Sequence, residues 1–489
     1  MAWTGIDPLL ASVAKRGSHP VGKLASAISA QLLKRNFSRG LGRNALASLA
    51  QNLIGLAAFL ITYRSLVGAV GLEAVGVWSL LMLGAVVGRA GDLSGGVALS
   101  KFVAHDVRDG NFTQAAVTTE TVMLTAIAFN LLLGGLVMWL MPMVLPSLVA
   151  ADQVAGATGL VVWVAGVLFA TGIGTAVASA IDGAQRADLR SYVMAMSYVV
   201  LVAVALILIP GLGVVGFAIA MVAQQVFMAI VGWYVIRAII PTVAAFPVRW
   251  SASRFRETFA FSVRINVISI TLILFEPIVK LSFNTVDGPS AVALYELASR
   301  LVTQARGLFL ALLAPVFPAF AATNGPGDPR FQTLLTGATR GALVGACVVV
   351  VASVTASPIV NWIVLDHTSN ELLLICAGLS IGWGINLLCT PLYYAAQSQG
   401  ILLWNFLTHL GMALVMLAVL AGAGRFVGWE PILLTLTGVL VLSAPFNYIA
   451  NARALQVGDV LRPFTPAMLG VSAGIALIGG AAAYASIIL

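Results

Sequence analysis

Charged residues are scarce in this chain. Only 9% of its 489 residues are Asp, Glu, Lys or Arg, and 60% are hydrophobic, whereas a soluble globular domain carries about 25% charged residues. This composition excludes an ordinary soluble fold. The apolar residues form repeated runs of about 20 residues, long enough to cross a bilayer. Because backbone groups in lipid must pair internally, such runs are expected to be helices.

Cysteine and histidine are also sparse, which bears on metal binding and catalysis. The three cysteines lie inside apolar runs without a CxxC pair, so they predict neither a disulfide framework nor a zinc site. The four histidines are scattered, and no HExxH, P-loop or GxSxG motif is present. The connections between apolar runs are too short for an extramembrane catalytic domain. We therefore expect no enzyme activity, no metal and no cofactor; a membrane-embedded glycan polymerase or acyltransferase is the enzyme alternative.

The apolar runs predict an all-α integral membrane protein with about 13 transmembrane helices. They lie near residues 44–66, 73–95, 117–141, 154–180, 190–210, 213–236, 259–284, 290–322, 337–357, 371–394, 401–421, 429–449 and 464–488. With the N-terminus in the cytoplasm, 19 Lys and Arg residues fall in cytoplasmic segments and only Arg64 and Arg425 in outer ones. This asymmetry follows the positive-inside rule. It predicts a multi-pass protein of the bacterial inner membrane with a cytoplasmic N-terminus.

An internal repeat divides the chain into two halves. At an offset of 217 residues, GLEAVGVWSLLMLGAVVGRAG lies without a gap over GPSAVALYELASRLVTQARGL. Gly71 then pairs with Gly288 and Arg89 with Arg306, and such repeats are common in transporters. We expect a basic cytoplasmic N-terminal segment at 1–37 and two pseudo-symmetric six-helix lobes around a central cavity. The lobes are predicted at 38–240 and 250–452, with an additional C-terminal helix at 464–488.

Ionisable residues inside the predicted spans mark candidate functional positions, since charges in a membrane are costly and face a cavity or each other. Glu276 and Lys280 are spaced i, i+4 on a polar stripe of their helix, and so are Glu296 and Arg300 on the next helix. Glu276 with Lys280 has a purely structural alternative, in which the pair only shapes the fold, and Arg89 with Asp92 has one in which the pair stabilises its lobe. Arg300 and Arg306 fit such an alternative less well, because their helix has one carboxylate for two guanidiniums. The remaining candidates are Arg89, Asp92, Arg264 and Arg306.

The balance of these charges indicates the sign of a ligand. We count five cations against three carboxylates inside the predicted spans. A surplus of cations in a water-filled cavity attracts an anion, and arginine suits phosphate through paired hydrogen bonds. A carrier for cationic drugs would be expected to show surplus carboxylates instead.

Two segments carry a family resemblance. NALASLAQNLIGLAAFLITYRSLVGAVGLEAVGVWSLL followed by GDLSGGVALSKFVA, and the later stretch GPSAVALYELASRLVTQARGLFLALLAPVFPAFA, resemble the polysaccharide transporter and O-antigen flippase family of the multidrug/oligosaccharidyl-lipid/polysaccharide (MOP) exporter superfamily. The resemblance rests on Arg64, the Gly71-Leu72-Glu73 turn, Gly76, Asp92-Leu93, Lys101 and the late Pro318. It implies a MATE-like arrangement of two bundles with alternating access. The expected count of about 13 helices differs from the 12 common in the family and the 14 of lipid II flippases.

The resemblance also implies a function. It implies a flippase that moves a polyprenyl-pyrophosphate-linked oligosaccharide, a polysaccharide or O-antigen (lipopolysaccharide) precursor, from the inner to the outer leaflet. A cation-coupled multidrug exporter of the MATE type and a lipid II-type flippase are the alternatives. Expected partners are the lipid-linked saccharide, membrane lipids and polysaccharide polymerase or export machinery, but no nucleic acid.

Roles for individual residues follow from combining the charges with this resemblance. For contact with the pyrophosphate or glycan we predict Arg300, Arg306, Lys280, Arg89, Arg64, Gln51, Asn52, Asn266 and Gln304. Glu276 and Asp92 are the candidates for coupling to a proton or sodium ion.

Overall fold

The computed structural model describes residues 20–90, 96–313, 316–321, 323–366 and 369–488, with some of the helical stretches described by their backbone alone. Every regular element in these ranges is a helix. The α-helices are α2 (Pro20–Ala90), α3 (Gly96–Arg108), α4 (Phe112–Val144), α5 (Val154–Gly183), α6 (Ala187–Leu212), α7 (Val214–Ile239), α8 (Ala252–Leu313), α9 (Val316–Ala321), α10 (Pro329–Leu365), α11 (Asn370–Asn386), α12 (Thr390–Ser398), α13 (Leu403–Gly422), α14 (Glu430–Ala454), α15 (Gly458–Leu461) and α16 (Thr465–Ile488). Short 3₁₀ turns follow α4, α11, α13 and α15, at Leu145–Ser147, Leu387–Cys389, Ala423–Arg425 and Arg462–Phe464.

Within the described residues, ten helices are long and apolar enough to cross a membrane. The first of these spans, Leu46–Val86, contains two arms of α2 that meet at Gly71. Helix α8 likewise has two arms that meet at Gly288. With both helices divided at their glycines, each of the expected spans overlaps a helix or a helical arm. The chain is therefore a multi-pass membrane protein.

Gly71 and Gly288 reverse the chain direction at equivalent points of the repeat. Their backbone angles are φ 80°, ψ 168° and φ 71°, ψ −166°. This region of backbone space is essentially restricted to glycine, because a Cβ would collide with the neighbouring peptide groups. The two glycines thus explain why two long helices fold back on themselves as hairpins.

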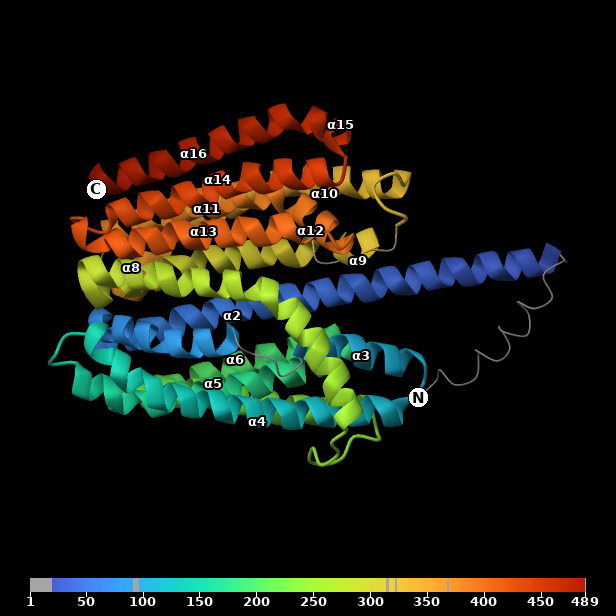
Figure 1. Cartoon of the computed structure of the whole chain (residues 1–489), viewed down its shortest axis with the longest axis horizontal. Helices are drawn as coiled ribbons and strands as arrows, with labels where there is room; N and C mark the ends of the chain where they lie inside the picture. Colours follow the sequence, from blue (N-terminus) through green and yellow to red (C-terminus); the bar gives the residue numbers. More distant parts are fainter. Residues whose placement is uncertain (1–19, 91–95, 314–315, 322, 367–368, 489) are drawn as a thin grey trace.

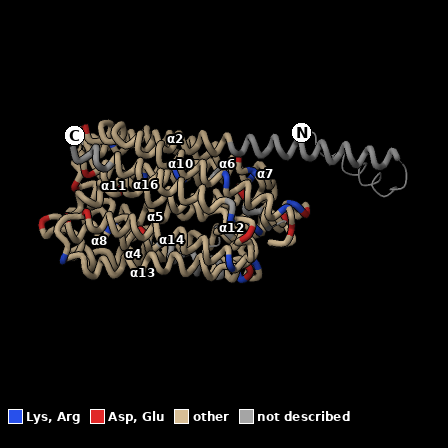
Figure 2. The backbone as a smooth tube through the Cα atoms, turned by 90° about the horizontal axis from the view of Figure 1, so that it is seen from above, with Lys and Arg blue, Asp and Glu red and all other residues tan. Residues whose placement is uncertain are grey.

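The helices form two groups that meet along α2 and α8 (Figure 1). Helices α3 to α7 lie on one side of this pair and α10 to α14 on the other, and α16 packs on the outside of α10 and α11. Lysines and arginines gather at the end of the bundle where α12 lies (Figure 2). The backbones of the two hairpins approach closely at Gly76, where a Cβ would lie 1.8 Å from the carbonyl oxygen of Pro289.

The connection between the two groups is anchored by a buried carboxylate. Glu120 on α4 is fully buried and accepts hydrogen bonds from the backbone N–H groups of Ala244 (2.9 Å), Val248 (3.2 Å) and Arg249 (2.9 Å). The Arg249 guanidinium completes the site as an ion pair. Glu120 lies in the predicted span 117–141, so the set of three in-span carboxylates expected from the sequence was incomplete. The linker at 241–251 is therefore fixed to the first group of helices and is not a free hinge.

Candidate functional site

A polar cavity of about 290 Å³ lies between the two hairpins, with α6 and α7 completing its wall. Its charged residues all come from α8. The facing residues from α2, α6 and α7 are aromatic, apolar or uncharged polar. The cavity is lined by Gly55, Phe59, Thr62, Tyr63, Trp78, Ser79, Met82, Val86, Tyr198, Leu201, Phe217, Met221, Gln224, Glu276, Lys280, Glu296, Ser299, Arg300, Thr303 and Gln304.

Four charged side chains in this wall form one continuous network. Lys280 Nζ lies 2.9 Å from a Glu276 carboxylate oxygen and 2.6 Å from Glu296 Oε2. Arg300 Nε donates to Glu296 Oε1 at 2.7 Å. The two i, i+4 ion pairs expected from the sequence are thus present, and Lys280 and Glu296 join them across the α8 hairpin.

The network has a buried centre and open ends. The side chains of Lys280 and Glu296 are 3% and 4% exposed, whereas those of Glu276 and Arg300 are 43% and 58% exposed. The buried pair has no access to solvent and satisfies its charges internally. Arg300 donates one N–H group to Glu296, and the rest of its guanidinium faces the cavity, where it can bind an anion.

The repeat explains why the cavity is charged on one side only. At the offset of 217 residues, Phe59, Tyr63, Ser79 and Leu83 occupy the positions of Glu276, Lys280, Glu296 and Arg300. The first hairpin therefore offers aromatic and hydroxyl groups to the cavity at the first three of these positions, and Leu83 does not line the cavity. The two central positions of the repeat also touch, because Ser79 Oγ donates to Glu296 Oε2 at 3.3 Å.

The charge balance of the cavity differs from the expected cation surplus. Two carboxylates and two cations line it, so the described network is neutral. Any preference for an anion must come from geometry: the more exposed cation is an arginine with free donors, while the carboxylate partner is buried.

Arg306 lies apart from this network. Its guanidinium carbon is 4.2 Å from the centre of the Trp383 ring, a cation–π contact. No carboxylate pairs with it among the described residues, and its Nε is buried without a hydrogen-bond partner. Tyr393 and His409, whose rings are 5.8 Å apart, belong to the same part of the second group of helices. The sequence thus grouped Arg300 with Arg306, whereas the structure separates their side chains.

Arg64 joins the two groups of helices at the end opposite the basic one. Its Nη1 lies 2.7 Å from the Asp366 carboxylate and also donates to the Ile363 carbonyl oxygen. Arg64 comes from α2, whereas Ile363 and Asp366 come from the end of α10. Both charged side chains are about half exposed or more. The contact bridges the two groups of helices at the surface, outside the polar cavity, and we call it the Arg64–Asp366 latch.

The remaining predicted residues are placed as follows. Gln304 lines the cavity. Gln51, one turn before the lining residue Gly55, has a buried Oε1 without a partner, and Asn52 donates to the Ser48 carbonyl oxygen at 2.9 Å. The side chains of Arg89, Asp92 and Asn266 lie outside the described residues.

The aromatic part of the uncharged cavity wall was not predicted from the sequence. Tyr63, Trp78 and Phe217 form a ring cluster there, with centroids 5.7 Å apart for Tyr63–Phe217 and 6.2 Å for Trp78–Phe217. Tyr63 lies before the aligned window, and it pairs with Lys280 only when the offset of 217 is extended toward the N-terminus. Phe217 lies on α7, outside the aligned window, and only packing brings it to the site.

Structural comparison identifies the fold. The sequence matches no protein-family model and no curated protein. The chain is similar to the inward-facing conformation of a multidrug resistance MATE family transporter of the MOP superfamily, with TM-score 0.65 and 16% identity over 84% of this chain and 98% of that one. It is also similar to a mutant of the Vibrio cholerae MATE transporter VcmN, with TM-score 0.63 and 17% identity over 87% and 98%. For an outward-facing MATE transporter the TM-score is 0.55, at 14% identity over 86% and 96%. The chain thus has the MATE fold.

Proposed function

We propose that this protein is a flippase that carries a polyprenyl-pyrophosphate-linked oligosaccharide across the bacterial inner membrane by alternating access, with its basic end in the cytoplasm. The single observation that carries the proposal is Arg300, a guanidinium open to the central cavity and held by the buried Glu296. Arginine binds phosphate oxygens through two parallel hydrogen bonds, and this geometry suits a pyrophosphate group.

The other cavity residues fit a saccharide headgroup. Ser299, Thr303 and Gln304 lie within one turn or so of Arg300 on α8 and offer hydroxyl and amide groups to sugar hydroxyls. Trp78 and Tyr63 on the opposite wall offer flat faces with polar edges, on which a sugar ring packs well. Arg306 and Arg64 are the further candidates for pyrophosphate contact, and Arg89, Gln51, Asn52 and Asn266 for contact with the headgroup along its path.

The network supplies a way to couple binding to an ion. A pyrophosphate that binds the exposed Arg300 competes with Glu296 for its guanidinium. Glu276 is the exposed carboxylate of the network, and we propose it as the group that binds a coupling proton or sodium ion. Asp92 is the second coupling candidate, and polysaccharide polymerase or export machinery would receive the product.

The latch between Arg64 and Asp366 fits one side of an alternating-access cycle. It closes the end opposite the basic one, and the fold resembles the inward-facing MATE conformation more than the outward-facing one. Release of the latch would open the cavity toward the outer leaflet.

Cation-coupled drug export is the second candidate, favoured by the MATE fold and by the half-exposed Glu276, a carboxylate that a cationic drug can reach. A lipid II-type flippase would use the same cationic contacts and is distinguished by its headgroup.

The deciding experiment follows lipid-linked saccharides in cells that lack the protein. The proposal expects a polyprenyl-linked pool that accumulates, resists an externally added glycosidase, and identifies its sugar by mass. Complementation with Arg300→Gln should leave the pool protected, whereas Arg425→Gln, a control for the loss of one exposed arginine, should restore access. An unchanged, accessible pool combined with new sensitivity to cationic drugs would replace the proposal with drug export.

A further inference from the structure

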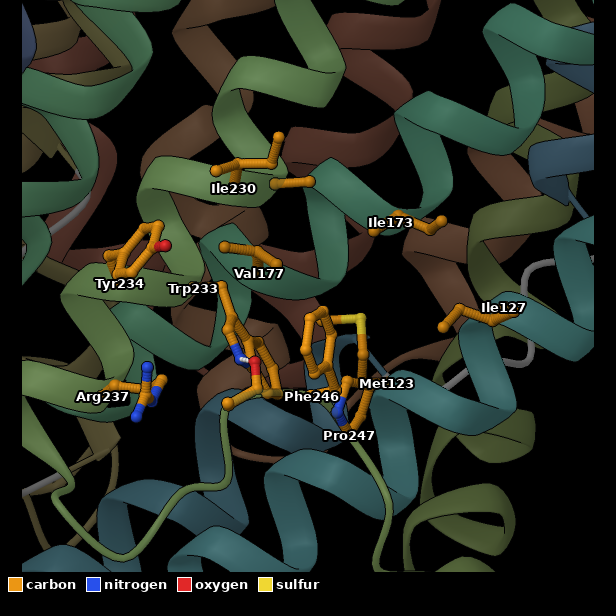
Figure 3. Close-up of a pocket in the computed structure, with 12 residues that line it drawn as sticks. Met123, Ile127, Ile173, Val177, Ile230, Trp233, Tyr234, Arg237, Phe246 and Pro247 are labelled. Carbon is orange, nitrogen blue, oxygen red and sulfur yellow. Dashed lines mark hydrogen bonds between the residues drawn. The ribbon is translucent and has the colours of Figure 1, made fainter.

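A second cavity, of about 380 Å³, opens on the outer surface of the first group of helices, away from the polar cavity. Helices α4, α5 and α7 form its walls, and residues 245–247 of the linker cover one side (Figure 3). We call this cavity the linker groove. It is lined by Met123, Ile127, Ile173, Val177, Ala229, Ile230, Trp233, Tyr234, Arg237, Ala245, Phe246 and Pro247.

Arg237 is the charged residue among these lining side chains. It lies in the last turn of α7, next to Tyr234, and Trp233 lies between it and Phe246 in Figure 3. Among the described residues no carboxylate pairs with Arg237, and its Nε is buried without a hydrogen-bond partner. A guanidinium held in this way lacks an anion, and one supplied from outside would satisfy it.

The groove lies near the basic end of the bundle. Arg237 belongs to the basic end of the bundle, where Figure 2 shows most lysines and arginines. Tyr234, Phe246 and Trp250 are 64%, 77% and 56% exposed around the groove. Aromatic side chains of this kind are enriched where hydrocarbon meets headgroups. In a membrane, this position would set the apolar groove against acyl chains and Arg237 against phosphates.

We infer that the linker groove is a binding site for one anionic phospholipid, whose acyl chain fills the groove and whose phosphate binds Arg237. Basic pockets between transmembrane helices recognise anionic headgroups in this manner. The lipid would touch α7 and the linker together, since Trp233 Nε1 donates to the Ala245 carbonyl oxygen at 3.0 Å. Glu120 fixes the same linker to α4 from within. The bound lipid therefore holds the segment that precedes α8, and this inference does not depend on the transported substrate.

The test compares phosphatidylglycerol with phosphatidylcholine of identical acyl chains. Purified, delipidated full-length protein is titrated with each lipid, and the one-to-one complexes are counted by native mass spectrometry. We expect phosphatidylglycerol to be retained about fivefold more than phosphatidylcholine, a ratio typical of one basic contact at a membrane surface. Arg237→Gln should bring the ratio near one, and Arg237→Lys should keep most of it.

Two further variants keep the result interpretable. Arg330→Gln removes an exposed arginine that does not line the groove, and it should leave the fivefold ratio unchanged. Ala229→Phe fills the groove while keeping Arg237, and it should reduce retention of both lipids. Each variant is used only if its thermal unfolding midpoint matches the unsubstituted protein within error. An unchanged ratio in Arg237→Gln, or unaltered retention in Ala229→Phe, would overturn the inference.

Discussion

Ser79 and Glu296 hold equivalent positions in the two halves of the chain, and they touch. Ser79 Oγ donates to Glu296 Oε2 at 3.3 Å across a sequence separation of 217 residues, the offset of the internal repeat. Residues related by a two-fold pseudo-symmetry meet only near its axis. The pair thus locates the axis, which passes through the wall of the polar cavity, and shows where the two halves differ in charge.

A carboxylate at position 79, the repeat equivalent of Glu296, should strongly reduce transport. Ser79→Glu would place a second buried carboxylate beside Glu296, where like charges destabilise each other. We expect transport of an anionic substrate to fall at least about tenfold, as a change of about 1.4 kcal/mol in binding would produce. Ser79→Ala removes one neutral hydrogen bond and should transport nearly normally. Accumulation of the protected lipid-linked pool measures the transport defect of the Ser79→Glu and Ser79→Ala variants. Normal export by Ser79→Glu would show that a second carboxylate beside Glu296 does not disturb the cavity.

The Lys280–Glu296 pair should matter for stability as well as function. Glu296→Gln leaves the buried Lys280 with only Glu276, and breaking a buried pair costs about 3–5 kcal/mol. Adding Lys280→Met removes the uncompensated charge and should recover most of this free energy of unfolding. Neither variant should transport. Thermal unfolding of the single and double variants measures the coupling, and additive losses would show that the two groups do not depend on each other.

The latch between Arg64 and Asp366 should set the balance between conformations. Its exposed ion pair contributes less than about 1 kcal/mol to stability, so Arg64→Asp should hardly alter unfolding. It should, however, lengthen the distance between spin labels at Gly68 and Glu371 by separating α2 from α11 at that end. The reversed pair Arg64→Asp with Asp366→Arg should restore the short distance. A distance that does not change in the single variant would argue against a latch.

The hairpin glycines should tolerate no side chain, although there is space for one. Apart from the adjacent backbone, no atom lies within 4 Å of a Cβ built on Gly71 or Gly288, so the cost of Gly71→Ala or Gly288→Ala is conformational, about 1–3 kcal/mol each. Gly68 provides the matched control. Its Cβ also meets nothing within 4 Å and its backbone is helical, so Gly68→Ala should be neutral or slightly stabilising. Thermal unfolding compares the three, and equal midpoints would contradict the backbone argument.

Substitution of the buried Glu120 should destabilise the protein more than substitution of an exposed charge. Glu120→Gln keeps the shape of the side chain but leaves the Arg249 guanidinium without its charged partner, and one amide N–H faces backbone donors. We expect a loss of about 2–4 kcal/mol in unfolding free energy, within the range for breaking buried charged hydrogen bonds. Arg256→Gln changes an exposed charge near the start of α8 and serves as the control. Similar unfolding midpoints for the two variants would show that the linker is held by other contacts.

The sequence predicted the ion pairs within each helix but not the network between helices. Glu276 with Lys280, and Glu296 with Arg300, follow from i, i+4 spacing on a known helix. The bond between Lys280 and Glu296 depends on the angle of the hairpin at Gly288. That angle is a backbone property that hydrophobic periodicity does not encode. Arg306 shows the same limit, since its position along α8 was evident but its turn toward Trp383 was not.

By itself the sequence determined that this chain crosses the membrane many times, that its halves repeat, and that α8 carries the charges. These properties depend on composition and on the spacing of residues along single helices, which local physics fixes. Only the tertiary structure decided that the charges of the polar cavity neutralise one another and that aromatic side chains from α2 and α7 face them. It also decided that Arg237 lines an apolar groove beside the linker. Each of these depends on which helix faces which, and packing between distant segments sets that arrangement.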